Sequence, residues 1–385
     1  MDLVPFRLDV ADAELDDLRA RLSRTRWPER ETVGDGDGLD WSQGIPLSYV
    51  RDLCGYWERD YDWRRAEAQV NAWPQWRAGV DGLGIHVLHA RSPEPDALPL
   101  VLTHGWPGSI VEFLKVIGPL SDPAAHGGDP ADAFHVVCPT LPGYGWSDKP
   151  ASTGWNVARI ADAWDELMRG LGYERYAAQG GDWGSMVTMC LGMQHPDHLV
   201  GLHVNMPIVR PDPATFDDLT DREKETLAAM EEHRRWGTGY SKQQSTRPQT
   251  VGYGLTDSPA GQCAWIVEKF WAWTDCDGHP ENVLTRDELL DNVMFYWLPA
   301  AAASSARLYW ESFRQVPSDR IGVPAGCSVF PGEVYRASRR WMEQRFADLR
   351  YWNELGRGGH FAAFEQPELF VTELRSCFRM MRARP

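Results

Sequence analysis

From residue 85 onward, short apolar runs that end in turn residues alternate with amphipathic stretches of helical spacing. Two parallel strands need a crossover connection, usually a helix, so this alternation predicts a mainly parallel sheet covered by helices and an α/β fold class. The predicted strands are 85–88, 98–102, 134–137, 176–178, 199–204, 327–330 and 349–352.

Two regions depart from this alternation. Near the N-terminus, Leu15, Leu18 and Leu22 recur at helical spacing, which predicts an N-terminal helical segment. After residue 206 the sequence becomes polar and aromatic with helical patterning, which predicts an inserted helical cap. The predicted division is an N-terminal helical segment at 1–95, an α/β core at 96–206 and 316–385, and a cap at 207–315.

Charge and motif content exclude several classes of protein. The chain has 385 residues and a net charge of -16, which argues against nucleic acid or an anionic membrane surface as a partner, since both attract clustered Lys and Arg. The seven cysteines are scattered without CxxC spacing, and HExxH, Walker A and GxGxxG motifs are missing. We therefore expect no metal, no organic cofactor and no disulfide framework.

The N-terminus and the lengths of the apolar runs indicate where the protein is located. The N-terminus has no signal-peptide apolar region, and no stretch approaches the roughly 20 apolar residues of a spanning helix. We expect a cytoplasmic protein. Exposed helices of the cap and the N-terminal segment would allow a homodimer.

The motif GGDWGS at 180–185 directly follows the predicted strand 176–178. It has the small-x-nucleophile-x-small form of a nucleophile elbow, with Asp182 where G-x-S-x-G has serine. A carboxylate is a competent nucleophile toward an electrophilic sp3 carbon, as in an epoxide or an alkyl halide. A helix N-cap aspartate is the alternative interpretation.

A second motif, THGWPGS at 103–109, follows the predicted strand 98–102. Its glycine-rich turn can aim the backbone N–H of Trp106, together with that of Trp183, at an oxygen acquiring negative charge. The two N–H groups would form an oxyanion hole. A plain strand-ending turn is the alternative.

Two further residues complete a possible triad. His360 lies between glycines in RGGHF at 357–361, where the loop lets its ring project into a cleft and act as a base. Glu333, in FPGE after the strand 327–330, offers the carboxylate that would orient the ring. Nucleophile, acid and histidine occur in the chain order of the α/β-hydrolases.

Together, GGDWGS, HGWPGS, FPGE and RGGHFAAFEQPE resemble the microsomal-type epoxide hydrolases of the α/β-hydrolase superfamily. The similarity covers nearly the whole chain. The resemblance implies an α/β-hydrolase fold with an inserted cap. It also implies that Asp182 is the nucleophile, that His360 is the base that activates water, and that Glu333 orients the base.

The same family uses two cap tyrosines that hydrogen-bond and protonate the epoxide oxygen. Their best counterparts here are Tyr240 and Tyr309, with Tyr253 and Tyr296 as nearby alternatives. Membrane-bound relatives begin with an apolar anchor, whereas this chain begins directly with Asp2, so the resemblance implies no membrane anchor.

The resemblance implies that the chain takes a small apolar epoxide and water and forms a vicinal diol through an alkyl ester on Asp182. A haloalkane dehalogenase with the same Asp nucleophile is an alternative, since the Trp183 indole offers one halide donor. Ester hydrolysis through serine fits less well, because Ser185 lies three residues beyond the elbow tip. A non-catalytic small-molecule binding protein on the same fold is the alternative from another class.

Overall fold

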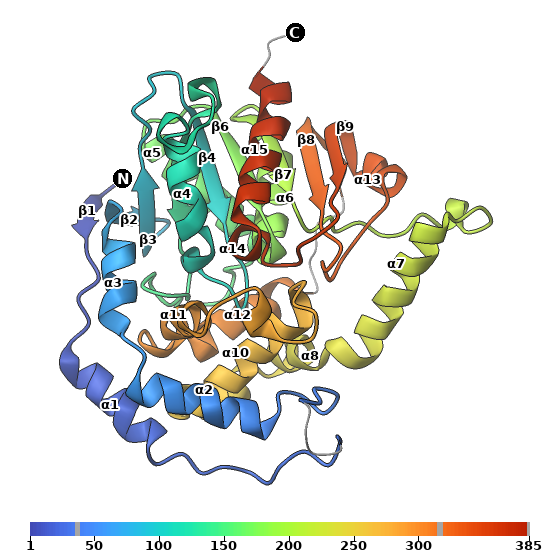
Figure 1. Ribbon diagram of the computed structural model, residues 1–385. Helices are drawn as coiled ribbons and strands as arrows, with labels where there is room; N and C mark the ends of the chain where they lie inside the picture. The colour runs from blue at the N-terminus through green and yellow to red at the C-terminus, as the bar shows by residue number, and fades with distance from the viewer. Residues whose placement is uncertain (35–38, 314–318, 383–385) are drawn as a thin grey trace.

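The computed structural model describes residues 1–34, 39–313 and 319–382. Within these residues, nine strands form one sheet in the order β1-β2-β3-β5-β4-β6-β7-β8-β9 (Figure 1). The strands are β1 (Leu3–Phe6), β2 (Gln75–Val80), β3 (Leu83–Ala90), β4 (Leu98–Thr103), β5 (Phe134–Pro139), β6 (Tyr176–Gly180), β7 (Leu199–Val204), β8 (Ile321–Val329) and β9 (Phe346–Glu354).

The sheet is mostly parallel, as predicted. Strands β5, β4, β6, β7, β8 and β9 pair in parallel, and β1, β2 and β3 add an antiparallel edge. The central strand β6 is buried along its whole length and contains the predicted apolar run at 176–178.

Helices cover both faces of this sheet. In Figure 1, α4 and α15 lie in front of the parallel strands, and α5 and α6 lie behind them. The helices are α1 (Asp12–Leu22), α2 (Leu47–Arg59), α3 (Trp63–Asn71), α4 (Leu114–Ser121), α5 (Val157–Gly170), α6 (Asp182–Gln194), α7 (Asp221–Glu232), α8 (Gly239–Thr246), α9 (Pro248–Asp257), α10 (Pro259–Trp273), α11 (Arg286–Trp297), α12 (Ala302–Ser312), α13 (Arg339–Arg345), α14 (Ala362–Glu365) and α15 (Pro367–Arg382). Among the described residues, no helix combines the length and the hydropathy needed to cross a membrane.

The prediction of a helical segment at 1–95 is incomplete. The segment contains α1, α2 and α3, but it also contains β1 and β2, which the sequence patterning did not indicate. Strand β2 reads QWRAGV and lacks a continuous apolar run, and it pairs with β3 through a two-residue turn at Asp81 and Gly82. Both turn residues have positive φ, 44° and 77°, as a tight hairpin requires.

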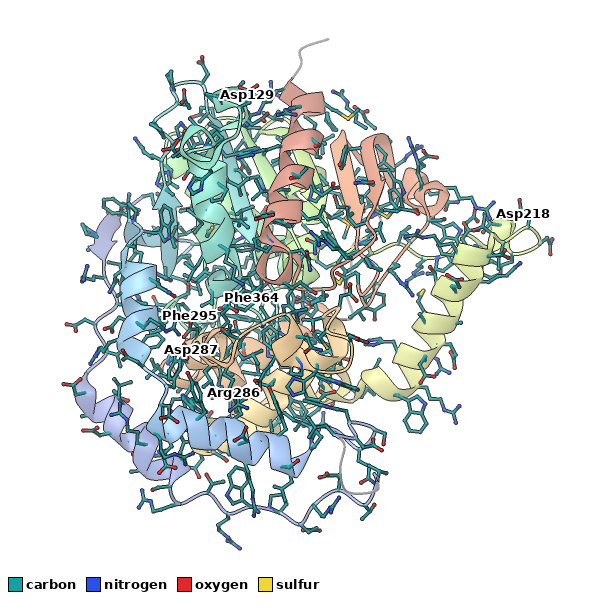
Figure 2. The ribbon with its side chains drawn as sticks, in the orientation of Figure 1. Asp129, Asp218, Arg286, Asp287, Phe295 and Phe364 are labelled. Atoms are coloured by element: carbon teal, nitrogen blue, oxygen red, sulfur yellow. The ribbon has the colours of Figure 1, made fainter. Side chains whose placement is uncertain are left out.

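The six helices α7–α12 occur between β7 and β8. Helices α8 and α10–α12 lie across the carboxyl ends of the parallel strands, and α2 lies on the far side of them (Figure 1). Figure 2 labels Arg286 and Asp287 at the start of α11, toward α2. The Tyr56 hydroxyl of α2 donates to Asp287 over 2.8 Å, and Arg286 pairs with Asp52, so the N-terminal helices brace the inserted ones.

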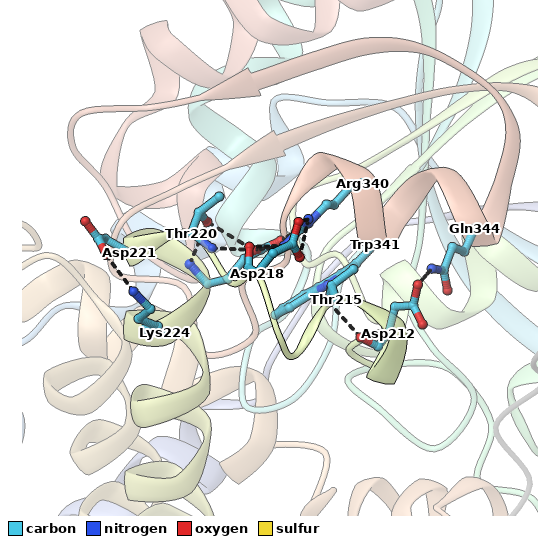
Figure 3. Close-up of polar contacts among 10 residues, drawn as sticks. Asp212, Thr215, Asp218, Thr220, Asp221, Lys224, Arg340, Trp341 and Gln344 are labelled. Atoms are coloured by element: carbon cyan, nitrogen blue, oxygen red, sulfur yellow. Dashed lines mark hydrogen bonds and ion pairs between the residues drawn. The ribbon is translucent and has the colours of Figure 1, made fainter.

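Helix α7 projects away from the sheet, and polar contacts at its N-terminal end join it to α13 (Figure 3). The Arg340 guanidinium donates to Glu223 over 2.7 Å, and the Trp341 indole donates to Thr215 over 3.0 Å. The Arg340 hydrogen bond, stronger than the opposing effect of burial, lowers the pKa of Glu223 to about 2. The pair is therefore ionised at neutral pH and ties the first of the inserted helices to the core.

Candidate active site

The four predicted motifs meet at one edge of the sheet. Trp106 follows β4, Asp182 follows β6, Glu333 follows β8 and His360 follows β9. Carboxyl ends of parallel strands lie at the same edge, where the inserted helices cover them. The topology explains why residues spread over more than 250 positions come into contact.

Asp182 stands at the tip of a sharp strand-to-helix turn. Its φ is +49°, a left-handed conformation that non-glycine residues seldom adopt. A Cβ on Gly180 would lie 2.1 Å from the carbonyl carbon of Gly184, and a Cβ on Gly184 would lie 1.9 Å from the carbonyl oxygen of Thr103. Only glycine fits at either position, so the two small residues of the motif are required by packing.

In the structure, the His360 ring lies between the carboxylates of Asp182 and Glu333 and contacts both. His360 Nε2 lies 3.4 Å from Asp182 Oδ2, and His360 Nδ1 lies 2.7 Å from Glu333 Oε1. His360 and Glu333 are buried, at 5% and 4% exposed. The imidazole therefore bridges the elbow carboxylate and a second, shielded carboxylate.

Electrostatics at this bridge favour a charged imidazole. Burial by itself would lower the pKa of His360, but the Coulombic attraction and hydrogen bonds of Glu333 and Asp182 outweigh it. The pKa of His360 is raised well above its ordinary value as a result. Removing the charge of either carboxylate would lower this pKa and leave more of the imidazole neutral at neutral pH.

The backbone N–H of Trp106 donates a 2.8 Å hydrogen bond to Asp182 Oδ1. The second predicted donor, the N–H of Trp183, belongs to the first turn of α6, where amides have no intrahelical acceptor. Gly105 must be small here, because a Cβ on it would lie 2.0 Å from Asp182 Oδ1. Asp182 thus presents Oδ1 to the predicted oxyanion donor and Oδ2 to His360.

Both predicted tyrosines face this carboxylate from the inserted helices. Tyr240 on α8 and Tyr309 on α12 line the same pocket as Asp182, and their ring centroids are 5.8 Å apart. Burial, with the charge of Asp182 adding to it, raises the pKa of each phenol well above the usual range. Both hydroxyls therefore stay protonated and can donate a proton.

The two alternative tyrosines are placed elsewhere. Tyr253 is 72% exposed, and the hydroxyl of the buried Tyr296 donates to the carbonyl of Gly108 over 2.6 Å. Neither of them lines the pocket that contains Asp182.

The pocket that contains Asp182 has a volume of about 210 Å³ and a mostly apolar lining. Its walls come from the elbow, from the inserted helices and from the segment after β8: Trp183, Met186, Met206, Ile208, Trp273, Phe313, Val334 and Tyr335. Tyr335 follows Glu333 by two residues and was not predicted. Such a lining suits an apolar ligand with one polar reacting group.

The loop that carries His360 is held by the last residue of α10 and by the segment after it, which the sequence motifs did not indicate. The His360 N–H donates to the carbonyl of Trp273 over 2.8 Å. The Gly358 N–H donates to the carboxylate of Asp275 over 2.8 Å. A Cβ on Gly359 would lie 2.4 Å from the Trp273 carbonyl oxygen, so this close approach also requires glycine.

Metal-ligand types gather in one other place among the described residues. Asp165, His195 and His198 bring ligand atoms within 4.8 Å of one another, at the opposite end of α6 from Asp182. Hydrogen bonds already engage these groups, with 2.7 Å from His198 Nδ1 to Asp165 Oδ1 and 2.8 Å from His195 Nε2 to Asp162. These hydrogen bonds explain why the three side chains lie together, and the cluster is too far from Asp182 to belong to its site.

Comparison with known proteins places this site in a family. Residues 3–113 match the family described as "Epoxide hydrolase N terminus", and residues 99–241 match "alpha/beta hydrolase fold". The protein named "Putative epoxide hydrolase" from Stigmatella aurantiaca is 55% identical over 383 residues, which cover 99% of this chain and 86% of that protein. Epoxide hydrolase 1 of Sus scrofa is 34% identical over 401 residues, covering 96% of this chain and 87% of that protein.

The solved structure of the Aspergillus niger epoxide hydrolase superposes with a TM-score of 0.90 at 31% identity, and the match covers 99% of this chain and 97% of that one. The fold is therefore the α/β-hydrolase fold, as the four motifs implied. On motif, fold and near-full-length similarity alike, the chain belongs to the epoxide hydrolase family.

Proposed function

We propose that this chain hydrolyses a small apolar epoxide to a vicinal diol through a covalent ester on Asp182. One arrangement carries the proposal: across an apolar pocket, the Asp182 carboxylate faces two protonated phenols, the buried Tyr309 and the partly buried Tyr240. A carboxylate on one side and acids on the other are what opening of an epoxide ring needs.

In the first step, Oδ2 of Asp182 attacks a ring carbon. The carbon–oxygen bond of the epoxide breaks as Tyr240 or Tyr309 gives its proton to the departing oxygen. Ester formation removes the negative charge of Asp182, which lowers the pKa of His360, and the proton that His360 releases restores the phenol. His360 is then a neutral base beside a neutral ester.

In the second step, His360 Nε2 takes a proton from water while the water oxygen bonds to Cγ of Asp182. The Trp106 N–H, which already donates to Oδ1, and the Trp183 N–H stabilise the negative oxygen that forms. The Cγ–Oδ2 bond then breaks, and the leaving alkoxide takes the proton of the new hydroxyl. Asp182 is again a carboxylate, and His360 is again protonated with Glu333 beside it.

The pocket supports a compact substrate. Its volume of about 210 Å³ is below the roughly 300–1,000 Å³ of sites for drug-sized ligands. The proposed reaction uses only side chains, backbone N–H groups and water, so it needs no cofactor. We also propose the division of the chain into residues 1–95, a core at 96–206 and 316–385, and a cap at 207–315 that supplies both tyrosines. The cytoplasmic location and the homodimer stay predictions.

The experiment that tests this proposal uses the variant His360→Gln with styrene oxide as probe. Ring opening should proceed and hydrolysis should stall, so intact-protein mass spectrometry should show one added substrate, mapping to Asp182. Asp182→Ala is the matched control and should acquire no mass. If wild-type protein turns over styrene oxide while His360→Gln never acquires the adduct, the two-step scheme is wrong.

The halide alternative is decided in the same assay. Haloalkanes offered beside styrene oxide should release no halide, because the groups opposite Asp182 are protonated phenols, whose hydroxyls suit a departing alkoxide. Halide release faster than diol formation would assign dehalogenation instead. Turnover of any probe would exclude a non-catalytic binding protein.

A further inference from the structure

A second, smaller cavity adjoins Asp182 and His360. Its volume is about 20 Å³, and its polar lining includes Glu112, Gln179 and Asn205. One water needs roughly 10–15 Å³ of such space, and it needs two to four polar partners. The cavity therefore has the size and the chemistry to hold a single water against the reacting pair.

Glu112 is a buried carboxyl that the proposed mechanism has not used. It lies in the short helical turn Ile110–Phe113 after the HGWPGS motif and is 9% exposed. Its carboxyl occupies the space that a side chain at position 108 would fill, because a Cβ on Gly108 would lie 1.5 Å from Glu112 Oε1. The glycine thus makes room for a carboxyl at the cavity wall.

Burial raises the pKa of Glu112 to about 8, with the nearby charge of Asp182 adding to this and that of His360 opposing it. At neutral pH the group is therefore mainly a neutral carboxylic acid. A neutral acid can donate a hydrogen bond, which a carboxylate cannot. It also adds no negative charge beside Asp182.

Gln179 supplies a complementary acceptor. It lies on β6 three residues before Asp182 and is 1% exposed. Its Nε2 donates to Asn205 Oδ1 over 2.9 Å, which fixes the amide. Its Oε1 is buried and has no hydrogen-bond partner among the described residues. A buried amide oxygen in that state needs a donor such as water.

We propose that Glu112 and Gln179 hold the hydrolytic water in this cavity, between His360 and the Asp182 ester. One proton of the water is directed to His360 Nε2 and the other to Gln179 Oε1. One lone pair accepts from the Glu112 acid, which leaves the second lone pair for Cγ of Asp182. The inference rests on the proposed function and assigns Glu112 to its second step alone.

Glu112→Leu tests this assignment, because it removes the hydrogen-bond donor at similar size. Hydrolysis of the ester should slow on the order of 10- to 100-fold, the effect of losing one well-placed hydrogen bond. Ring opening should be little changed. With styrene oxide in excess, intact-protein mass spectrometry at steady state should therefore show the Asp182 adduct in Glu112→Leu.

Glu112→Gln should restore hydrolysis, because its amide N–H replaces the acid as donor. Val116→Ala is the control: Val116 is buried on α4 and does not line the cavity, so a change in nearby core packing without loss of a polar group should accumulate no adduct. Gln179→Met removes the acceptor from the other wall and should accumulate the adduct too. It serves as the second variant if Glu112→Leu does not fold.

Two outcomes separate this inference from the proposed function. Adduct in His360→Gln but none in Glu112→Leu or Gln179→Met would overturn the water site and leave the Asp182 ester intact. Equal adduct in Glu112→Leu and Glu112→Gln would also overturn it, since simple disturbance of packing would then explain both. Absence of adduct in His360→Gln would overturn both proposals together.

Discussion

The indole of Trp106 stacks on the phenol of Tyr240, with ring centroids 5.0 Å apart and ring planes 9° from parallel. The backbone N–H of the same tryptophan donates to Asp182 Oδ1. Trp106 therefore contacts the proposed nucleophile through its main chain and a proposed proton donor through its side chain. The Tyr309 ring packs edge-on against the same indole at 5.8 Å, so the Trp106 ring supports both tyrosines.

This dual contact predicts a selective effect of Trp106→Ala. The substitution keeps the backbone N–H but removes the support of both phenols. Since a displacement of about 1 Å can slow a reaction on the order of 100-fold, ring opening should slow by that order. Hydrolysis of a preformed ester should change little. Single-turnover kinetics with styrene oxide, following adduct formation and decay separately, would measure the two steps.

Trp310→Ala is the control for that experiment. Trp310 follows Tyr309 on α12 but is 48% exposed, so its removal should leave both steps unchanged. If Trp106→Ala slowed hydrolysis as much as ring opening, the backbone turn would have moved and the selective role of the ring would be refuted.

The contacts of His360 with Asp182 and Glu333 predict how the pKa of His360 changes when either carboxylate is neutralised. Both carboxylates raise the pKa of His360 against the opposing effect of burial, and the Coulombic effect of Glu333 is the largest of the raising contributions. Asp182→Asn should therefore lower this pKa, and Glu333→Gln should lower it further. An NMR titration of the His360 ring, assigned with His360→Gln, would test the order.

The same shift fixes how stability depends on pH. The folded-state pKa of His360 is above the ordinary value of about 6.5, so protonation stabilises the fold. That contribution is fully present below pH of about 6.5 and is lost as pH rises through the folded-state pKa. Glu333→Gln should thus lose stability relative to the wild type mainly at pH values below the folded-state pKa of His360. Denaturant unfolding at several pH values would measure this loss. An equal loss at every pH would contradict the assignment.

The sequence indicated the candidate site residues because their neighbours are constrained locally. Gly180 and Gly184 must be glycine for the elbow to form, and the glycines beside His360 serve a close backbone approach, so each motif is visible in a short stretch. Strand patterning also succeeded for the buried parallel strands. It missed β2, whose exposed and polar positions hide the pairing, although the Asp81-Gly82 dipeptide after it is a hairpin signal.

Other parts of the site depend on contacts between distant segments, which no local pattern records. Asp275 reaches Gly358 across 83 positions. Glu112 was missed for a different reason, since Ser109-Ile110-Val111-Glu112 has the form of a helix capping box, which is a sufficient local explanation for both polar residues. Only the placement of its carboxyl beside the Asp182 cavity indicates another use.

The contact between Asp275 and Gly358 predicts that the segment after α10 supports His360, the proposed base. Asp275→Ala removes the acceptor of the Gly358 N–H, and a hydrogen bond to a charged group is worth about 1.5–3 kcal/mol. Because His360 is two residues away, hydrolysis should slow about tenfold or more while ring opening is largely kept. Asp275→Asn retains an acceptor oxygen and should restore most of the rate. Equal loss in both variants would show that charge, and not the hydrogen bond, matters.

The elbow predicts a sharp contrast between two glycines. Gly184→Ala would place a methyl group 1.9 Å from the Thr103 carbonyl oxygen, which belongs to the adjacent strand β4 and cannot move without disturbing the sheet. We expect a loss of more than about 3 kcal/mol in the free energy of unfolding, or no folded protein. Gly254→Ala, in helix α9 with no atom within 4 Å of the new methyl group, should instead be neutral or stabilise by up to about 1 kcal/mol. Chemical denaturation of both variants measures the contrast, and a Gly184→Ala protein as stable as Gly254→Ala would show that the turn does not require its glycine.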